Sequence, residues 1–114
     1  TKGVNNFMEP AELLKIYDQE QRIDLAPPGT LREDTGRVIR HVIPSERFGF
    51  IAYSNLNETS AGVEIEAQVA YFDHLGLGFE WKAYDHDPPA DLTERLAARG
   101  FEIEEPEALL VLDL

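Results

Sequence analysis

The stretch Arg37–Tyr53, with the sequence RVIRHVIPSERFGFIAY, decides the fold. Its first half, Arg37–Ile43, is rich in β-branched residues and is bounded by Gly36 and Pro44. Its second half, Phe48–Tyr53, is again mostly apolar and follows after a four-residue turn. Two such runs joined by a short turn predict a β-hairpin. We therefore expect a sheet with helices packed on it.

Two helices are predicted on either side of this hairpin. Residues 8 to about 22 carry apolar side chains at helical spacing with charged residues between them, which predicts an amphipathic helix. A second helix is expected to begin near Gly62, with Thr59 or Ser60 as its N-cap. Gly76 is expected to end it in the left-handed conformation of a C-terminal cap.

The remaining segments complete the predicted order of elements. Residues 24–36 are dense in Pro, Gly and Asp and predict a loop. Phe79–Tyr84 alternates apolar and polar residues and predicts a half-buried strand. Asp91 and Glu94 have the spacing of a capping box, which predicts a third helix that ends at Gly100.

The chain is expected to end in two further strands, within Phe101–Glu104 and over Ala108–Leu114. The predicted order is α-β-β-α-β-α-β-β in one domain, residues 1–114. This order predicts an α+β fold with a mostly antiparallel, mixed sheet and packed helices. Because the last strand has no polar tail and the start lacks Met, we expect a fragment of a longer protein whose terminal strand docks on a partner or forms a homodimer.

Composition narrows the classes of function. The chain has 114 residues, no cysteine and a formal net charge of −12. Such an acidic chain with scattered cations argues against nucleic acids and anionic membranes as partners, and is compatible with a cationic amine. The absence of cysteine excludes disulfides and thiol catalysis and fits a cytoplasmic location, and no apolar run is long enough for a membrane helix.

Tyr84-Asp85-His86-Asp87 is the strongest candidate site, because three kinds of titratable side chain cluster at the end of a strand. Tyr84 and His86 are candidate catalytic acid–base groups, and Asp85 and Asp87 are candidate ligands for a cationic amine. The alternative is a turn at Asp87-Pro88-Pro89 whose side chains cap backbone groups. No metal site is predicted, because the segment supplies too few ligands.

Other candidate groups in the sequence give weaker indications of a functional site. The run Asp73–Gly78 has the Gly-x-Gly spacing of a phosphate-binding loop, but it follows a helix instead of preceding one, so a helix stop and tight turn are expected. His41 and His74 have no partner in the sequence. The carboxylates of Glu102, Glu104, Glu105 and Glu107 are expected to face solvent, with a site for a cationic substrate as the alternative. None of the serines considered, Ser45, Ser54 and Ser60, lies in the Gly-x-Ser-x-Gly context of a nucleophile elbow.

The segment FEWKAYDHDPPADLTERLAARGFE, residues 79–102, with Glu105-Pro106-Glu107 and Val111-Leu112-Asp113 after it, resembles bacterial proteins of the GNAT superfamily of acetyltransferases. The resemblance covers roughly residues 63–114 and is to the amino-terminal region that precedes the catalytic domain. It implies transfer of an acetyl group from acetyl-CoA to a primary amine by the full-length protein. In the family, a Gln/Arg-x-x-Gly-x-Gly/Ala loop between a strand and a helix holds the pyrophosphate.

This chain lacks that loop, since residues 73–78 keep only the glycine spacing and place Asp73 at the basic or amide position. The resemblance therefore implies an accessory domain that binds no acetyl-CoA itself and packs on a catalytic domain in the same chain. Two alternatives stay open. One is a free-standing minimal N-acetyltransferase that uses Tyr84 or His86. The other is a non-enzymatic interaction module that uses Ala108–Leu114.

Overall fold

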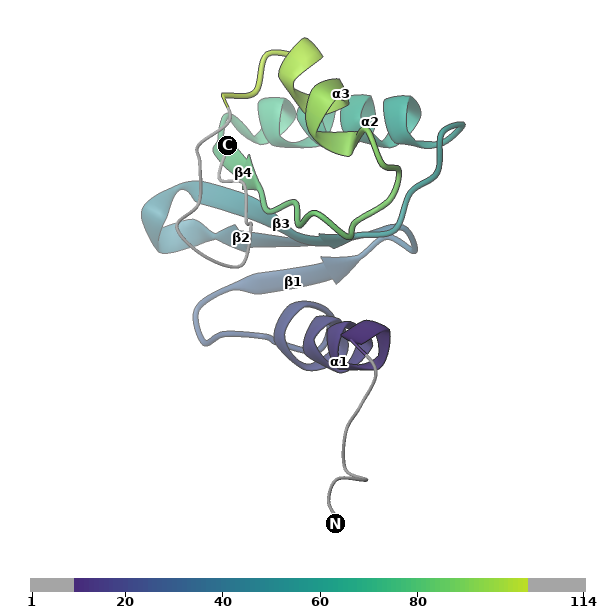
Figure 1. The fold of residues 1–114 in the computed structure, drawn as a ribbon. Helices are drawn as coiled ribbons and strands as arrows, with labels where there is room; N and C mark the ends of the chain where they lie inside the picture. Colours follow the sequence, from purple (N-terminus) through teal and green to yellow (C-terminus); the bar gives the residue numbers. More distant parts are fainter. Residues whose placement is uncertain (1–9, 103–114) are drawn as a thin grey trace.

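The computed structural model describes residues 10–102 as a sheet between two helical layers (Figure 1). Helices α2 and α3 lie on one face of the sheet, and α1 with its continuation η2 lies on the other (Figure 1). The helical segments are α1 (Pro10–Tyr17), the π-helical η2 (Asp18–Ile23), the 3-10 turn η3 (Pro44–Glu46), α2 (Ala61–Leu75) and α3 (Leu92–Ala98). The strands are β1 (Leu31–Asp34), β2 (Val38–Ile43), β3 (Phe48–Ser54) and β4 (Gly78–Trp81).

The predicted hairpin is confirmed as β2 and β3, which pair antiparallel around η3. The strands stand in the order β1-β2-β3-β4. The pairs β1–β2 and β2–β3 are antiparallel, whereas β3 and β4 are parallel and are connected through α2. The α+β class and the mixed sheet are therefore as expected.

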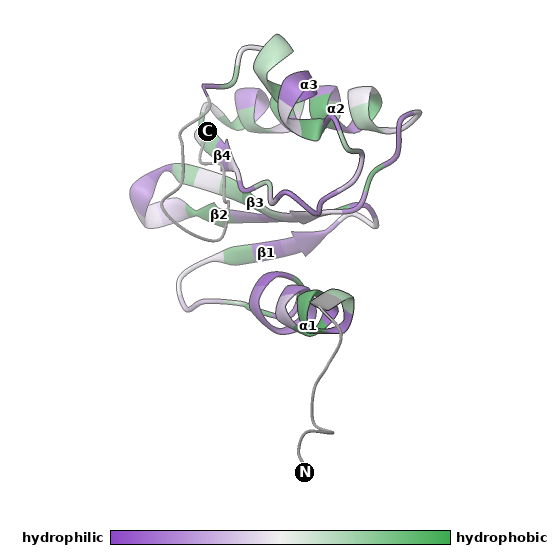
Figure 2. Cartoon of the chain, viewed as in Figure 1, coloured by the Kyte–Doolittle hydropathy of each residue, from purple (hydrophilic) through white to green (hydrophobic). Residues whose placement is uncertain are grey.

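The prediction of a loop over residues 24–36 was wrong at its end, where Leu31–Asp34 forms β1. All four residues of β1 are exposed, and the strand is hydrophilic after its first residue (Figure 2). It forms because its backbone pairs with β2, from Leu31 opposite Val42 to Asp34 opposite Ile39. A strand with no buried face lacks the alternation by which sequence patterns show strands.

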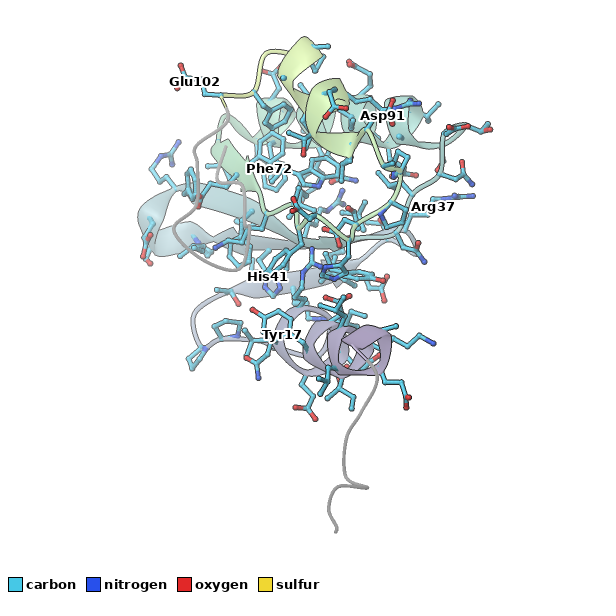
Figure 3. The ribbon with its side chains drawn as sticks, in the orientation of Figure 1. Tyr17, Arg37, His41, Phe72, Asp91 and Glu102 are labelled. Atoms are coloured by element: carbon cyan, nitrogen blue, oxygen red, sulfur yellow. The ribbon has the colours of Figure 1, made fainter. Side chains whose placement is uncertain are left out.

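The core fills the space between the sheet and the layer of α2 and α3. Trp81, Phe72, Ile51 and Leu96 are completely buried there. The Phe72 ring stacks on Phe79 with centroids 4.3 Å apart and lies between α2 and the sheet (Figure 3). It passes so close to β3 that a Cβ at Gly49 would overlap it.

The predicted C-terminal ends and N-cap positions of α2 and α3 are confirmed, but the predicted side-chain caps are not formed. Gly76 has φ of 70° and donates to the Asp73 and Phe72 carbonyls, as a left-handed cap does. Ser60 precedes α2 but makes no side-chain cap; its Oγ accepts from the Asn57 amide instead. Asp91 forms no capping box either, because its carboxylate binds the Arg95 Nε at 2.9 Å.

At the end of the described chain, Phe101 and Glu102 lie outside any strand. The rest of the predicted strand to Glu104, and the predicted strand Ala108–Leu114, fall outside the described residues. Within residues 10–102, no helix is both long enough and apolar enough to cross a bilayer.

Candidate functional site

A single arginine side chain links the carboxyl ends of the parallel strands β3 and β4. Arg22 enters from η2 and is only 2% exposed. Its Nε donates to the Ala52 carbonyl of β3 at 2.9 Å, and its Nη2 donates to the Lys82 carbonyl just beyond β4 at 3.1 Å. The guanidinium therefore occupies the place where the two strands separate.

Two carboxylates complete the surroundings of this guanidinium. Asp87 receives two hydrogen bonds in the bidentate geometry, Nη1 to Oδ1 at 2.8 Å and Nη2 to Oδ2 at 2.6 Å. Asp18, one helical turn before Arg22, accepts from Nη1 at 3.0 Å. All five N–H groups that an arginine offers are thus used within the fold. Asp87 also accepts the Tyr84 amide at 3.0 Å, which fixes the turn after β4.

The surrounding carboxylates keep the Arg22 guanidinium charged despite its burial. Burial alone lowers the pKa of Arg22, but hydrogen bonds and charge from Asp87 and Asp18 outweigh burial and leave the pKa above its ordinary value. A buried pair with this many hydrogen bonds offsets the cost of taking two ions out of water. Arg22 is therefore a fixed cation that no proton transfer uses.

Tyr84 lies against this cluster on the side of α1. Its hydroxyl is 3.0 Å from the Tyr17 hydroxyl, and its ring faces the Arg22 guanidinium at 4.0 Å. Burial, followed by the hydrogen bond to Tyr17, raises the pKa of Tyr84 well above its ordinary value. At neutral pH the phenol is a donor and an acceptor of hydrogen bonds, and it is not a base.

Of the other predicted site residues, His86 joins the cluster and Asp85 does not. The His86 Nε2 lies 2.9 Å from the Asp18 Oδ2 and 3.9 Å from the Asp87 Oδ1. Asp85 is exposed, and its side chain forms no hydrogen bond or ion pair with the described part of the chain. Asp87 faces the Arg22 cation and not solvent, because its side chain is 1% exposed. The turn interpretation of Asp87 is thus the one that its contacts fit.

The fold also brings together three side chains of metal-ligating types, one of which is far from the other two in the sequence. One ligand atom each from Asp18, His86 and Asp87 lies within 4.8 Å of the others. Asp18 is 68 residues from His86 along the chain, which is why the local sequence offered too few ligands. The Arg22 guanidinium binds both carboxylates and would repel a second cation placed between them.

A pocket of about 290 Å³ opens beside the cluster, on the face of the sheet that carries α1. His41 and Tyr17 lie on this side of the sheet (Figure 3). The pocket reaches from the loop after η2 to the end of β4, and its lining includes Leu25, Pro27, His41, Phe50, Lys82 and Tyr84. Tyr84 therefore borders a pocket, whereas His86 is absent from its lining.

Sequence reasoning found Tyr84, His86 and Asp87 and missed the residues that organise them. Arg22 and Asp18 stand four residues apart on a predicted helix, the spacing of a helical ion pair. That spacing was the available signal. No comparable signal marked Tyr17 or Lys82, because their partners are far away in the sequence.

Comparison with protein-family profiles, with curated protein sequences and with solved structures found no match for this chain.

Proposed function

We propose that residues 1–114 form the amino-terminal accessory domain of a GNAT-type acetyltransferase. A catalytic domain in the same chain would transfer the acetyl group from acetyl-CoA to a primary amine. Support comes from the resemblance carried by residues 79–102. It also comes from the strand–helix–strand unit β3-α2-β4, which occurs where the predicted order of elements has a strand, a helix and a strand.

The observation that carries the accessory role is the position of Arg22. In sheets with parallel strands, ligands bind in the crevice outside the carboxyl ends of the strands. Here that place holds the Arg22 guanidinium, which bonds Ala52 of β3, Lys82 beyond β4, and Asp87. A cofactor could enter only by displacing a buried, fully bonded cation, at a cost of several kcal/mol.

The loop between β3 and α2 supports the same role. A pyrophosphate needs free backbone N–H groups at a helix N-terminus, usually brought close by glycines. Between Ser54 and Ala61 there is no glycine. The amides of Thr59 and Ser60 already donate to the Asn57 Oδ1, at 2.9 and 2.8 Å. A carboxylate, Glu64, stands in the first turn of α2 and would repel an anion.

Titration calorimetry of the 114-residue chain with acetyl-CoA tests the accessory role. We expect no binding in the micromolar range, and stoichiometric micromolar binding would contradict the proposal. The reading frame that encodes this chain should also contain a Gln/Arg-x-x-Gly-x-Gly/Ala loop between a strand and a helix. Its full product should acetylate primary amines and keep its rate when Tyr84→Phe and His86→Ala are introduced here.

A minimal acetyltransferase formed by this chain alone is the second candidate. It is favoured by one observation, that Tyr84 borders a pocket and lies in the same cluster as His86. It requires that the 114-residue chain acetylate amines by itself and lose this activity in Tyr84→Phe or His86→Ala. The same two variants therefore separate the candidates, because only the second predicts an effect.

A further inference from the structure

We propose that the pocket between the β2–β4 sheet face and the loop after η2 binds a small carboxylic acid with a planar apolar body and a hydroxyl group. The inference concerns a site separate from acetyl transfer and does not depend on the proposed function. It rests on three groups of complementary chemistry that line one cavity, namely an ammonium, an imidazole nitrogen and an apolar wall.

The ammonium belongs to Lys82. It lies 5.1 Å from the centroid of the Phe50 ring and forms no ion pair with any described residue. The other cation in the lining, Arg22, is balanced by Asp87 and Asp18, whereas the charge of Lys82 is not balanced in this way. In a chain with a net charge of −12, an unpaired ammonium at a pocket is a local site for an anion.

The imidazole belongs to His41, which is 1% exposed and stacks on Phe50 with centroids 4.7 Å apart. Its Nδ1 lies 3.4 Å from the Thr30 Oγ, which itself donates to the Pro27 carbonyl at 2.8 Å. The Thr30 oxygen is therefore an acceptor for Nδ1–H, which leaves Nε2 as the acceptor of the ring. Nε2 has no partner among the described residues, and His41 lines the pocket.

The His41 Nε2 stays a hydrogen-bond acceptor at neutral pH, because the ring is not protonated there. Burial, followed by the charge of Arg32, lowers the pKa of His41 below its ordinary value of 6.5. The neutral ring keeps a lone pair on Nε2 for a ligand that donates, such as a hydroxyl group. Glu80 stands opposite Phe50 in the β3–β4 register and is not part of the pocket lining.

The apolar lining and the volume of the pocket indicate the shape and polarity of the ligand. Leu25, Pro27, Phe50 and Ala52 give an apolar lining. The volume of about 290 Å³ is at the lower end of ligand pockets, which run from about 300 to 1,000 Å³. A single ring with small substituents suits both features. The carboxylate would bind the Lys82 ammonium, and the hydroxyl would donate to the His41 Nε2.

Binding is tested by NMR titration of the 114-residue chain with 3- and 4-hydroxybenzoate, benzoate and 3-hydroxybenzyl alcohol. The better hydroxybenzoate should bind about tenfold more tightly than the alcohol, which lacks the carboxylate. It should bind about fivefold more tightly than benzoate, which lacks the hydroxyl. The largest shift changes should be at His41, Phe50 and Lys82. Equal affinities for all probes, no saturable binding, or shifts mapped elsewhere would overturn the proposal.

Two variants assign the contacts separately. Lys82→Met should remove the preference for hydroxybenzoate over the alcohol, and Lys15→Met, the same change on exposed α1, should leave it intact. His41→Phe keeps a ring against Phe50 and should remove the preference for hydroxybenzoate over benzoate only. Its fold is checked by the Trp81 fluorescence spectrum. A preference that survives its variant, or that is lost in Lys15→Met, would contradict the assigned contact.

Discussion

Replacing Arg22 with Met should cost the domain about 3–5 kcal/mol of unfolding free energy, the range for removing one partner of a buried ion pair. Met replaces the apolar stem of the arginine side chain with one of similar bulk while removing the charge and all the donors. The carboxylates of Asp87 and Asp18, whose side chains are 1% and 13% exposed, would lose their cation. The carbonyls of Ala52 and Lys82 would lose their donor in the same step.

Urea unfolding followed by fluorescence measures this loss, because the single tryptophan, Trp81, is completely buried in the native state. Arg99→Met is the matched control. Arg99 pairs with Glu66 on the surface, where the side chains are 45% and 59% exposed. Exposed pairs contribute about 0–1 kcal/mol, so this variant should stay within that range.

A second comparison distinguishes a lost pair from a lost side chain. Arg22→Met combined with Asp87→Leu removes both charges, so it leaves no carboxylate of that pair unpaired. The unfolding free energy lost in the double variant should be clearly smaller than the sum of the losses in the two single variants. The reasoning is refuted if Arg22→Met costs less than about 1 kcal/mol, the value for an exposed pair, or if the single losses simply add.

Three further outcomes follow from individual positions. Gly49→Ala should destabilise the domain by about 1–3 kcal/mol, because the new methyl group overlaps the Phe72 ring. Gly62→Ala has open space around the new methyl group and should be neutral or stabilise the domain by up to about 1 kcal/mol. The urea midpoints of the two variants test this contrast. Ser54→Ala should be neutral or stabilising in thermal unfolding, because the buried Ser54 hydroxyl has no hydrogen-bond partner among the described residues, and a loss above about 1 kcal/mol would contradict this. The lowered pKa of His41 means that the unfolded chain takes up a proton near pH 6.5 while the folded chain does not. Its contribution to stability is thus present above pH 6.5 and is lost as pH falls, by at most about 1.4 kcal/mol per pH unit. The unfolding free energy of the wild type minus that of His41→Phe should therefore fall steadily from pH 7 to pH 5, and a constant or rising difference would exclude this titration.

The sequence predicted the elements whose signals are local. The hairpin at β2 and β3, the ends of α2 at Gly76 and α3 near Gly100, and the strand at Phe79 depend on apolar periodicity and on glycine at positive φ, and they were confirmed. The short strand β1 was missed because all of its residues are exposed, so it has no apolar face, and its Glu33 side chain pairs with Arg40 of β2 across the strands. Ser60 and Asp91 are the N-cap residues of α2 and α3 as predicted, but their side chains do not cap, because Ser60 bonds the Asn57 amide and Asp91 pairs with Arg95.

The candidate site was predicted only in part, because only those of its contacts that are local in the sequence leave a signal there. Tyr84, His86 and Asp87 are neighbours in the sequence, so their grouping was visible. Their roles depend on Arg22 and on Asp18, more than 60 residues earlier, which only the packing of η2 against β3 brings into contact. A local pattern could show that carboxylates and an imidazole are close together, but not that an arginine had neutralised them.

Arg22 occupies the place at the carboxyl ends of β3 and β4 where a cofactor would bind, which agrees with the lack of a cofactor-binding loop in the sequence. Where parallel strands separate at their carboxyl ends, the free backbone carbonyls need partners, which a ligand, water or the protein's own side chains can supply. In this chain Arg22 fills this role, with the carbonyls of Ala52 and Lys82 and the Asp87 carboxylate as partners. Because the same contacts stabilise the domain, opening this place to a cofactor would need Arg22 and Asp87 to change together. A single Arg22 variant should therefore lose stability without gaining affinity for acetyl-CoA, which calorimetry on a folded Arg22→Met protein would check.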